Sequence, residues 1–112
     1  MHIKLTAESL LSQFGYNVNE ASLKQMNTIL DNTANFDKFS KHLLGLHDNL
    51  KHTNSYIAMS NSHNYFKIKS ESANESLLTE FNELVLKWAD KYNVTLEKVE
   101  NKNVYYILGI KE

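Results

Sequence analysis

A stripe of apolar residues in the middle of the chain gives way to strict alternation, and this change of period constrains the fold most. The stripe recurs at steps of three and four residues: Phe36, Phe39, Leu43, Leu46 and Leu50. That spacing is typical of one face of an α-helix. From Tyr56 onward, apolar and polar residues alternate in two runs around a small polar turn, as in a β-hairpin. The residues predicted to face the core are Ile57, Met59, Phe66 and Ile68.

Helix-start and helix-end signals divide the rest of the chain. Thr6 and Asn19 are predicted N-caps of two short helices, and Gly15 follows the first of them. Ser72 and Glu75 have the spacing of a capping box. This box should open the longest helix, at about 73–92.

A second hairpin is predicted after the long helix, with strands near 94–99 and 104–110. The last strand is apolar on both faces. We expect its Val104, Tyr106 and Leu108 to face the core, and Tyr105 and Ile107 to lie on the other face. A strand that is apolar on both sides is typical of a strand covered on both sides.

Together these elements predict one α+β domain over residues 1–112. Three N-terminal helices should be followed by a ββαββ unit with a four-stranded, mainly antiparallel sheet and a long amphipathic helix packed on it. We expect the N-terminal helices to cover the opposite face of that sheet. A domain of 112 residues buries enough surface to fold without disulfides or metal.

Several classes of chemistry lack their usual residues. The chain has no cysteine and no arginine, and its three glycines are never clustered, which argues against thiolate chemistry, a P-loop and a dinucleotide fingerprint. His42, His47 and His52 recur every five residues, so on a helix each turns by about 140° from the last. We therefore expect no enzyme activity, no metal site and no cofactor.

The charge is unevenly spread, which keeps a nucleic-acid function open. The net charge is −1, but the middle third of the chain is basic. In a winged-helix interpretation, helix 36–51 would enter the major groove and hairpin 56–69 would contact the backbone. The candidate DNA-binding residues are Lys38, Lys41, His42, His63, Lys67 and Lys69. The lack of arginine and the negative net charge count against this alternative.

A protein partner is the preferred hypothesis. Tyr56, Tyr65 and Tyr105 are predicted on strand faces opposite the core, and tyrosine is favoured in protein interfaces. We expect a non-enzymatic regulatory or adaptor protein, such as a phage- or bacterium-encoded inhibitor. No stretch approaches the roughly 18 apolar residues of a membrane span and no signal-peptide run is present, so we expect a cytoplasmic protein without membrane contact. Homo-oligomerisation is left open.

Overall fold

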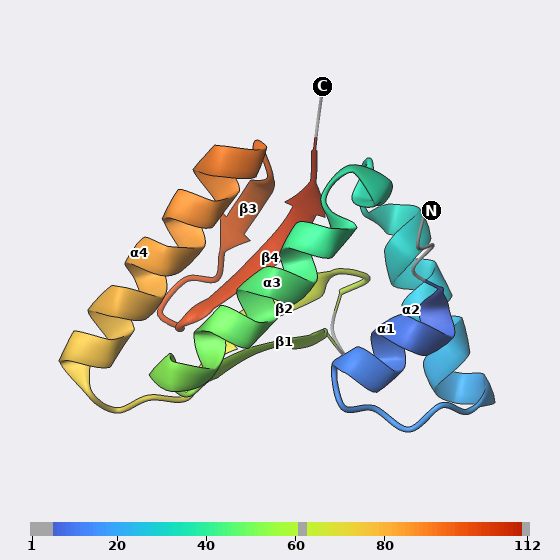
Figure 1. Cartoon of the computed structure of the whole chain (residues 1–112), viewed down its shortest axis with the longest axis horizontal. Helices are drawn as coiled ribbons and strands as arrows, with labels where there is room; N and C mark the ends of the chain where they lie inside the picture. Colours follow the sequence, from blue (N-terminus) through green and yellow to red (C-terminus); the bar gives the residue numbers. More distant parts are fainter. Residues whose placement is uncertain (1–5, 61–62, 111–112) are drawn as a thin grey trace.

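The computed structural model describes residues 6–60 and 63–110, and it shows a four-stranded antiparallel sheet with helices (Figure 1). The α-helices are α1 (Ala7–Gln13), α2 (Glu20–Asn32), α3 (Ser40–Leu50) and α4 (Glu75–Tyr92). Two 3-10 turns flank α3, η1 (Phe36–Lys38) and η2 (Lys51–Thr53). The strands are β1 (Ser55–Met59), β2 (Phe66–Ser70), β3 (Thr95–Lys98) and β4 (Val104–Gly109), in the order β1-β2-β4-β3. The predicted α+β class and element order are confirmed.

The predicted helix over 36–51 is interrupted at its start. Phe39, with φ −130° and ψ 6°, separates η1 from α3. The apolar stripe survives this break, because Phe36, Phe39, Leu43, Leu46 and Leu50 are all buried. The two predicted strands of the first hairpin are also present, but residues 61 and 62 of its turn lie outside the described residues.

One face of the sheet carries the core. In register, Ile57 lies beside Ile68, which lies beside Tyr105, and the next row is Met59, Phe66 and Ile107. Helices α3 and α4 cross this face side by side (Figure 1). Successive residues of a strand point to opposite faces of the sheet. The residues between these rows therefore point away from α3 and α4.

The N-terminal helices do not cover the opposite face, so that expectation is wrong. Helices α1 and α2 pack on each other and stand beside the sheet, where β1 ends (Figure 1). Their buried residues Leu10, Leu11, Met26 and Ile29 join the same core cluster as the inner face of the sheet. The apolar faces of α1 and α2 therefore extend that one core, and no helix of the described residues forms a third layer.

The helix starts follow local capping chemistry. Thr6 and Asn19 cap α1 and α2 as predicted, each in a reciprocal pair with the serine three residues later. For α4 the predicted box is wrong. Asn74 is the N-cap, and its Oδ1 accepts from the backbone N–H groups of Ser76 and Leu77. Ser72 instead accepts from the N–H of Asn74 and holds the cap in place.

Replacement of Gly45 by alanine should stabilise the fold. Gly45 lies in the middle of α3, is exposed, and a Cβ built on it meets no atom within 4 Å. Glycine in a helix interior costs about 1 kcal/mol relative to alanine. Gly45→Ala should therefore raise the free energy of unfolding by up to about 1 kcal/mol, measured by urea denaturation. A loss of stability would show that the space beside Gly45 is occupied.

The free edge of β1 is blocked by two side chains. In an antiparallel pair the N–H groups of alternate residues point away from the neighbouring strand. In β1 those of Ile57 and Met59 point away from β2 and donate to side chains. His47 Nδ1 accepts from Ile57 N–H at 3.1 Å, and the Tyr16 hydroxyl accepts from Met59 N–H at 3.0 Å. Edge strands with unpaired groups invite pairing with other chains, so this edge is closed to a partner strand.

The His47 contact predicts a pH dependence of stability. Burial, and secondarily the charge of Lys51, lowers the pKa of His47 below its ordinary value of 6.5. The unfolded chain therefore binds a proton on His47 at a higher pH than the folded chain does. Stability from this group is complete above about pH 6.5 and should fall as the pH drops from there to the folded pKa.

Urea denaturation between pH 7.5 and 5 measures this loss. In His47→Gln, the amide oxygen can still accept from Ile57 N–H but has no proton to gain. The variant should therefore lose less stability than the parent chain over this range. Parallel curves for the two proteins would contradict the assignment.

Candidate binding surface

The second face of the sheet is free of helices and forms the candidate site, which we call the open face. Because strand residues alternate between faces, the register assigns its members: Tyr56 and Ala58 from β1, Tyr65 before β2, Lys67 and Lys69 from β2, Glu97 from β3, and Val104, Tyr106 and Leu108 from β4. Ala58 and Val104 are buried between their larger neighbours. The tyrosines, Lys67, Lys69 and Leu108 are half-buried.

Two of the three predicted tyrosines lie on the open face. Tyr56 is half-buried, and its hydroxyl donates to Glu71 Oε1 at 3.0 Å. Burial, then the hydrogen bond and charge of Glu71, raises the pKa of Tyr56 above its usual 10.0. Tyr65 is also half-buried. The Tyr56 hydroxyl therefore stays protonated at neutral pH and serves as the polar tip of its ring.

The assignment of Tyr105 to this surface is wrong. Tyr105 is only 6% exposed and lies in the core row beside Ile68. Its hydroxyl donates to Asn82 Oδ1 on α4 at 2.6 Å, and burial raises its pKa. Both faces of β4 are apolar, so alternation alone could not decide which one turns inward. The register with β2 decides it.

Tyr106 takes the place predicted for Tyr105, at the middle of the open face. Its ring centroid lies 5.1 Å from that of His63 and 6.0 Å from that of Tyr65. Lys67 stands directly across from it on β2, and Glu97 stands across from it on β3. The sequence held one usable signal, since adjacent residues of a strand point to opposite faces, so Tyr105 and Tyr106 cannot share one face.

A basic depression lies beside Tyr106. It has a volume of about 450 Å³. Its walls come from the residue after β1, from β2 and β4, and from the turn between β3 and β4. They are Ser60, Lys67, Lys69, Ser70, Val99, Lys102, Asn103, Val104 and Tyr106. Three of these residues carry a positive charge and none carries a negative one. The depression therefore favours an anionic group.

The residues proposed for DNA binding do not share one surface. Lys67 and Lys69 belong to the open face, whereas Lys38 and Lys41 are exposed on η1 and α3, which lie on the opposite side of the sheet (Figure 1). His42 stacks on Tyr92 of α4 with ring centroids 3.9 Å apart. His63 is exposed near Tyr106. These residues do not form the single basic face that a winged-helix interface needs.

The histidines of the described residues have separate surroundings. His47 accepts a backbone hydrogen bond, and His52 Nε2 lies 2.8 Å from Glu80 Oε2. Over the ranges 6–60 and 63–110, no three His, Cys, Asp or Glu side chains come together in a way that could hold a metal ion.

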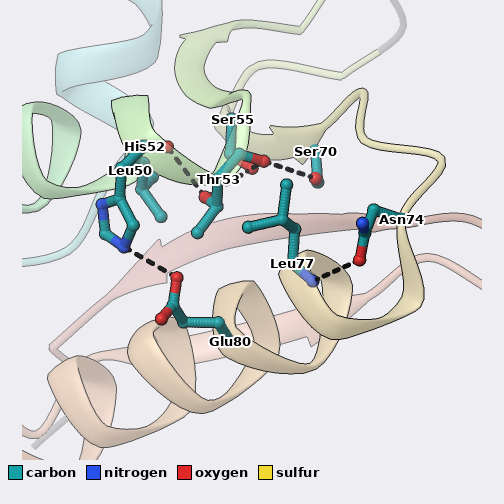
Figure 2. A network of polar contacts seen from close by, with 8 residues as sticks. All are labelled: Leu50, His52, Thr53, Ser55, Ser70, Asn74, Leu77 and Glu80. Atoms are coloured by element: carbon teal, nitrogen blue, oxygen red, sulfur yellow. Dashed lines mark hydrogen bonds and ion pairs between the residues drawn. The ribbon is translucent and has the colours of Figure 1, made fainter.

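A cluster of hydroxyl groups lies near the His52–Glu80 pair, at the junction of η2, β1 and β2 (Figure 2). Thr53 Oγ1 donates to the Leu50 carbonyl at 2.8 Å, and Ser55 Oγ donates to the Thr53 carbonyl at 3.0 Å. Ser70 Oγ reaches the same Thr53 carbonyl at 3.5 Å. Thr53 Oγ1 also lies 2.9 Å from Ser55 Oγ, so these hydroxyl groups bond to backbone carbonyls and to one another. The cluster satisfies the polar groups that are buried at this junction.

Comparison with known proteins gives no match: no family model, curated protein or solved structure is significantly similar to this chain. No helix among the described residues is long and apolar enough to cross a membrane.

Proposed function

We propose that the chain is a non-enzymatic regulatory or adaptor protein that binds a protein partner through the open face of its sheet. The observation that carries this proposal is the placement of Tyr56, Tyr65 and Tyr106 on a sheet face that no described helix covers. Aromatic residues are enriched at the centres of protein interfaces, because a rigid ring buries a large area and its polar tip keeps a hydrogen bond.

The composition of the open face supports the same proposal. An antiparallel sheet can leave one face in water, and such a face is usually polar. Here the middle of the face carries Val104, Tyr106 and Leu108, with Lys67 and Lys69 beside them. An apolar and aromatic centre with charged neighbours is the usual arrangement of an interface. The lysines favour a partner with an acidic surface, since complementary charge speeds encounter and sets specificity.

The arginine-free, lysine- and asparagine-rich composition suits a small inhibitor or adaptor from a phage or a bacterium, and we place its action in the cytoplasm. The proposal needs no cofactor and no metal.

Site-specific photo-crosslinking tests the surface. A benzophenone amino acid is placed at Tyr65 on the open face and, as a matched control, at exposed Lys87 on α4. In lysate of the cells that produce the chain, the Tyr65 position should give one discrete protein adduct that is absent from the Lys87 position. Equal adducts from both positions, or an adduct from Lys87 alone, would contradict binding through the open face.

A further inference from the structure

We propose that the basic depression beside Tyr106 binds a phosphorylated side chain of the protein partner. The inference rests on the proposed function and adds the chemical class of the group that is recognised. Its basis is the convergence of Lys67, Lys69 and Lys102 on one concave site of about 450 Å³.

The backbone sets the positions of the three charges. Lys67 and Lys69 are two residues apart on β2, so their side chains leave the same face of the strand about 7 Å apart at the backbone. Lys102 comes from the turn between β3 and β4 and lines the same depression. An anion in the depression would therefore be lined by lysines from two separate segments of the chain.

The remaining walls divide into a polar and an apolar part. Ser70 and Asn103 pair across β2 and β4, where the Ser70 N–H donates to the Asn103 carbonyl at 3.0 Å. Val99, Val104 and Tyr106 line the rest. Lysines beside an apolar wall suit a phosphorylated side chain, because the lysines can hold the phosphoryl group while the wall contacts the carbon atoms.

Charges around the depression favour one discrete anion over a long polyanion. Glu71 lies 3.9 Å from the Lys69 ammonium and accepts from Tyr56, on the β1 side of the open face. Glu97 stands across from Tyr106 on the β3 side. A nucleic-acid strand crossing this face would bring phosphates near one or both carboxylates, where like charges repel. The residues that line the depression include no carboxylate, so a single phosphoryl group held there touches lysines and no acidic side chain.

The number of lysines favours a phosphoryl group over a carboxylate. A phosphorylated side chain carries a charge of about −1.5 to −2 at neutral pH and three acceptor oxygens. Lysine binds phosphate as a compact point charge, without the planar fork of arginine. Three ammonium groups are therefore better matched by this charge than by the single charge of a carboxylate.

Titration followed by amide NMR shifts tests the assignment. The probe is an acetylated, amidated Gly-Gly-phosphoserine-Gly-Gly peptide, compared with its serine and glutamate counterparts. We expect shifts at Lys67, Lys69, Asn103 and Tyr106 with the phosphopeptide, and weaker binding of both counterparts. The triple variant Lys67→Gln, Lys69→Gln, Lys102→Gln should weaken phosphopeptide binding by about tenfold, since each exposed charge contributes a few-fold.

A matched control distinguishes binding in the depression from nonspecific attraction of the phosphopeptide to surface lysines. Lys24→Gln, Lys41→Gln and Lys87→Gln remove the same net charge from exposed positions on α2, α3 and α4. This control triple should bind the phosphopeptide with nearly unchanged affinity. An equal loss in both triples, or equal affinity for the glutamate peptide, would overturn the proposal.

The affinities for two other ligands are compared with the affinity for the phosphopeptide. Inorganic phosphate binding as tightly as the phosphopeptide would indicate a site for a free anion. Tighter binding of a ten-residue oligothymidylate, with shifts across the whole open face, would indicate a nucleic-acid surface. Either result would overturn the proposal. A crosslink from Tyr65 that persists in the Lys67, Lys69, Lys102 triple would refute the phosphate assignment and leave the proposed function standing.

Discussion

Replacing Gly109 with alanine should destabilise the fold by about 3 kcal/mol or more, because two costs add at this position. Gly109 has φ +108°, a conformation that L side chains rarely adopt, and a Cβ built there would clash with the Ala34 carbonyl oxygen. The clash is with backbone that is held in place. Ala34 N–H donates to the Leu108 carbonyl, and Ile110 N–H donates to the Ala34 carbonyl. A backbone shift that removes the clash must therefore break these hydrogen bonds between β4 and the connection that follows α2.

Gly15 provides the matched control for Gly109→Ala. It also has a positive φ, +83°, but nothing lies within 4 Å of its added Cβ. Gly15→Ala therefore carries only conformational strain of about 1 kcal/mol. Urea denaturation of both variants measures the difference. Equal losses would show that the approach of Ala34 to Gly109 does not constrain the fold.

Truncation of Phe66 to alanine is the second large effect, with an expected loss of about 3–5 kcal/mol. Phe66 is fully buried on β2. Its ring centroid lies 5.8 Å from that of Phe14, which follows α1, and 5.6 Å from that of Phe36 in η1. The ring therefore joins the sheet to the N-terminal helices and to the connection before α3. Its removal leaves a cavity where three parts of the fold meet.

Urea denaturation compares two substitutions at the buried Phe66 with one substitution at the surface. Phe66→Leu keeps most of the apolar volume and should lose less stability than Phe66→Ala. Leu86→Ala, at a position 52% exposed on α4, should change the free energy of unfolding by about 0.5 kcal/mol or less. A loss of about 1 kcal/mol or less for Phe66→Ala would contradict the packing of α1 and η1 on the sheet.

Much of the fold could be predicted because local patterns agree with tertiary packing. The apolar stripe of α3 and the alternation in β1 and β2 are buried as their periods imply. Thr6 and Asn19 act as caps because a short polar side chain before a helix can satisfy its free N–H groups. These features depend on neighbours within a few residues, and a sequence displays them directly.

The predictions that were wrong concern features that depend on contacts between segments distant in the sequence. β4 is apolar on both faces, so only its pairing with β2 shows that Tyr105 turns inward and Tyr106 outward. The side taken by α1 and α2 depends on how they complete the core beside β1, which no periodicity records. Lys102 was missed as a site residue, because only the folded turn brings it beside Lys67 and Lys69.

Hydroxyl-radical footprinting of two neighbouring tyrosines examines whether the open face is the binding surface. In the free chain, half-buried Tyr106 should be oxidised several-fold faster than Tyr105, which is 6% exposed. In the partner complex captured by crosslinking, Tyr106 should become protected while exposed Leu86 on α4 keeps its rate. If Tyr106 is as protected as Tyr105 in the free chain, or if the complex protects Leu86 and leaves Tyr106 reactive, the open face is not the binding surface.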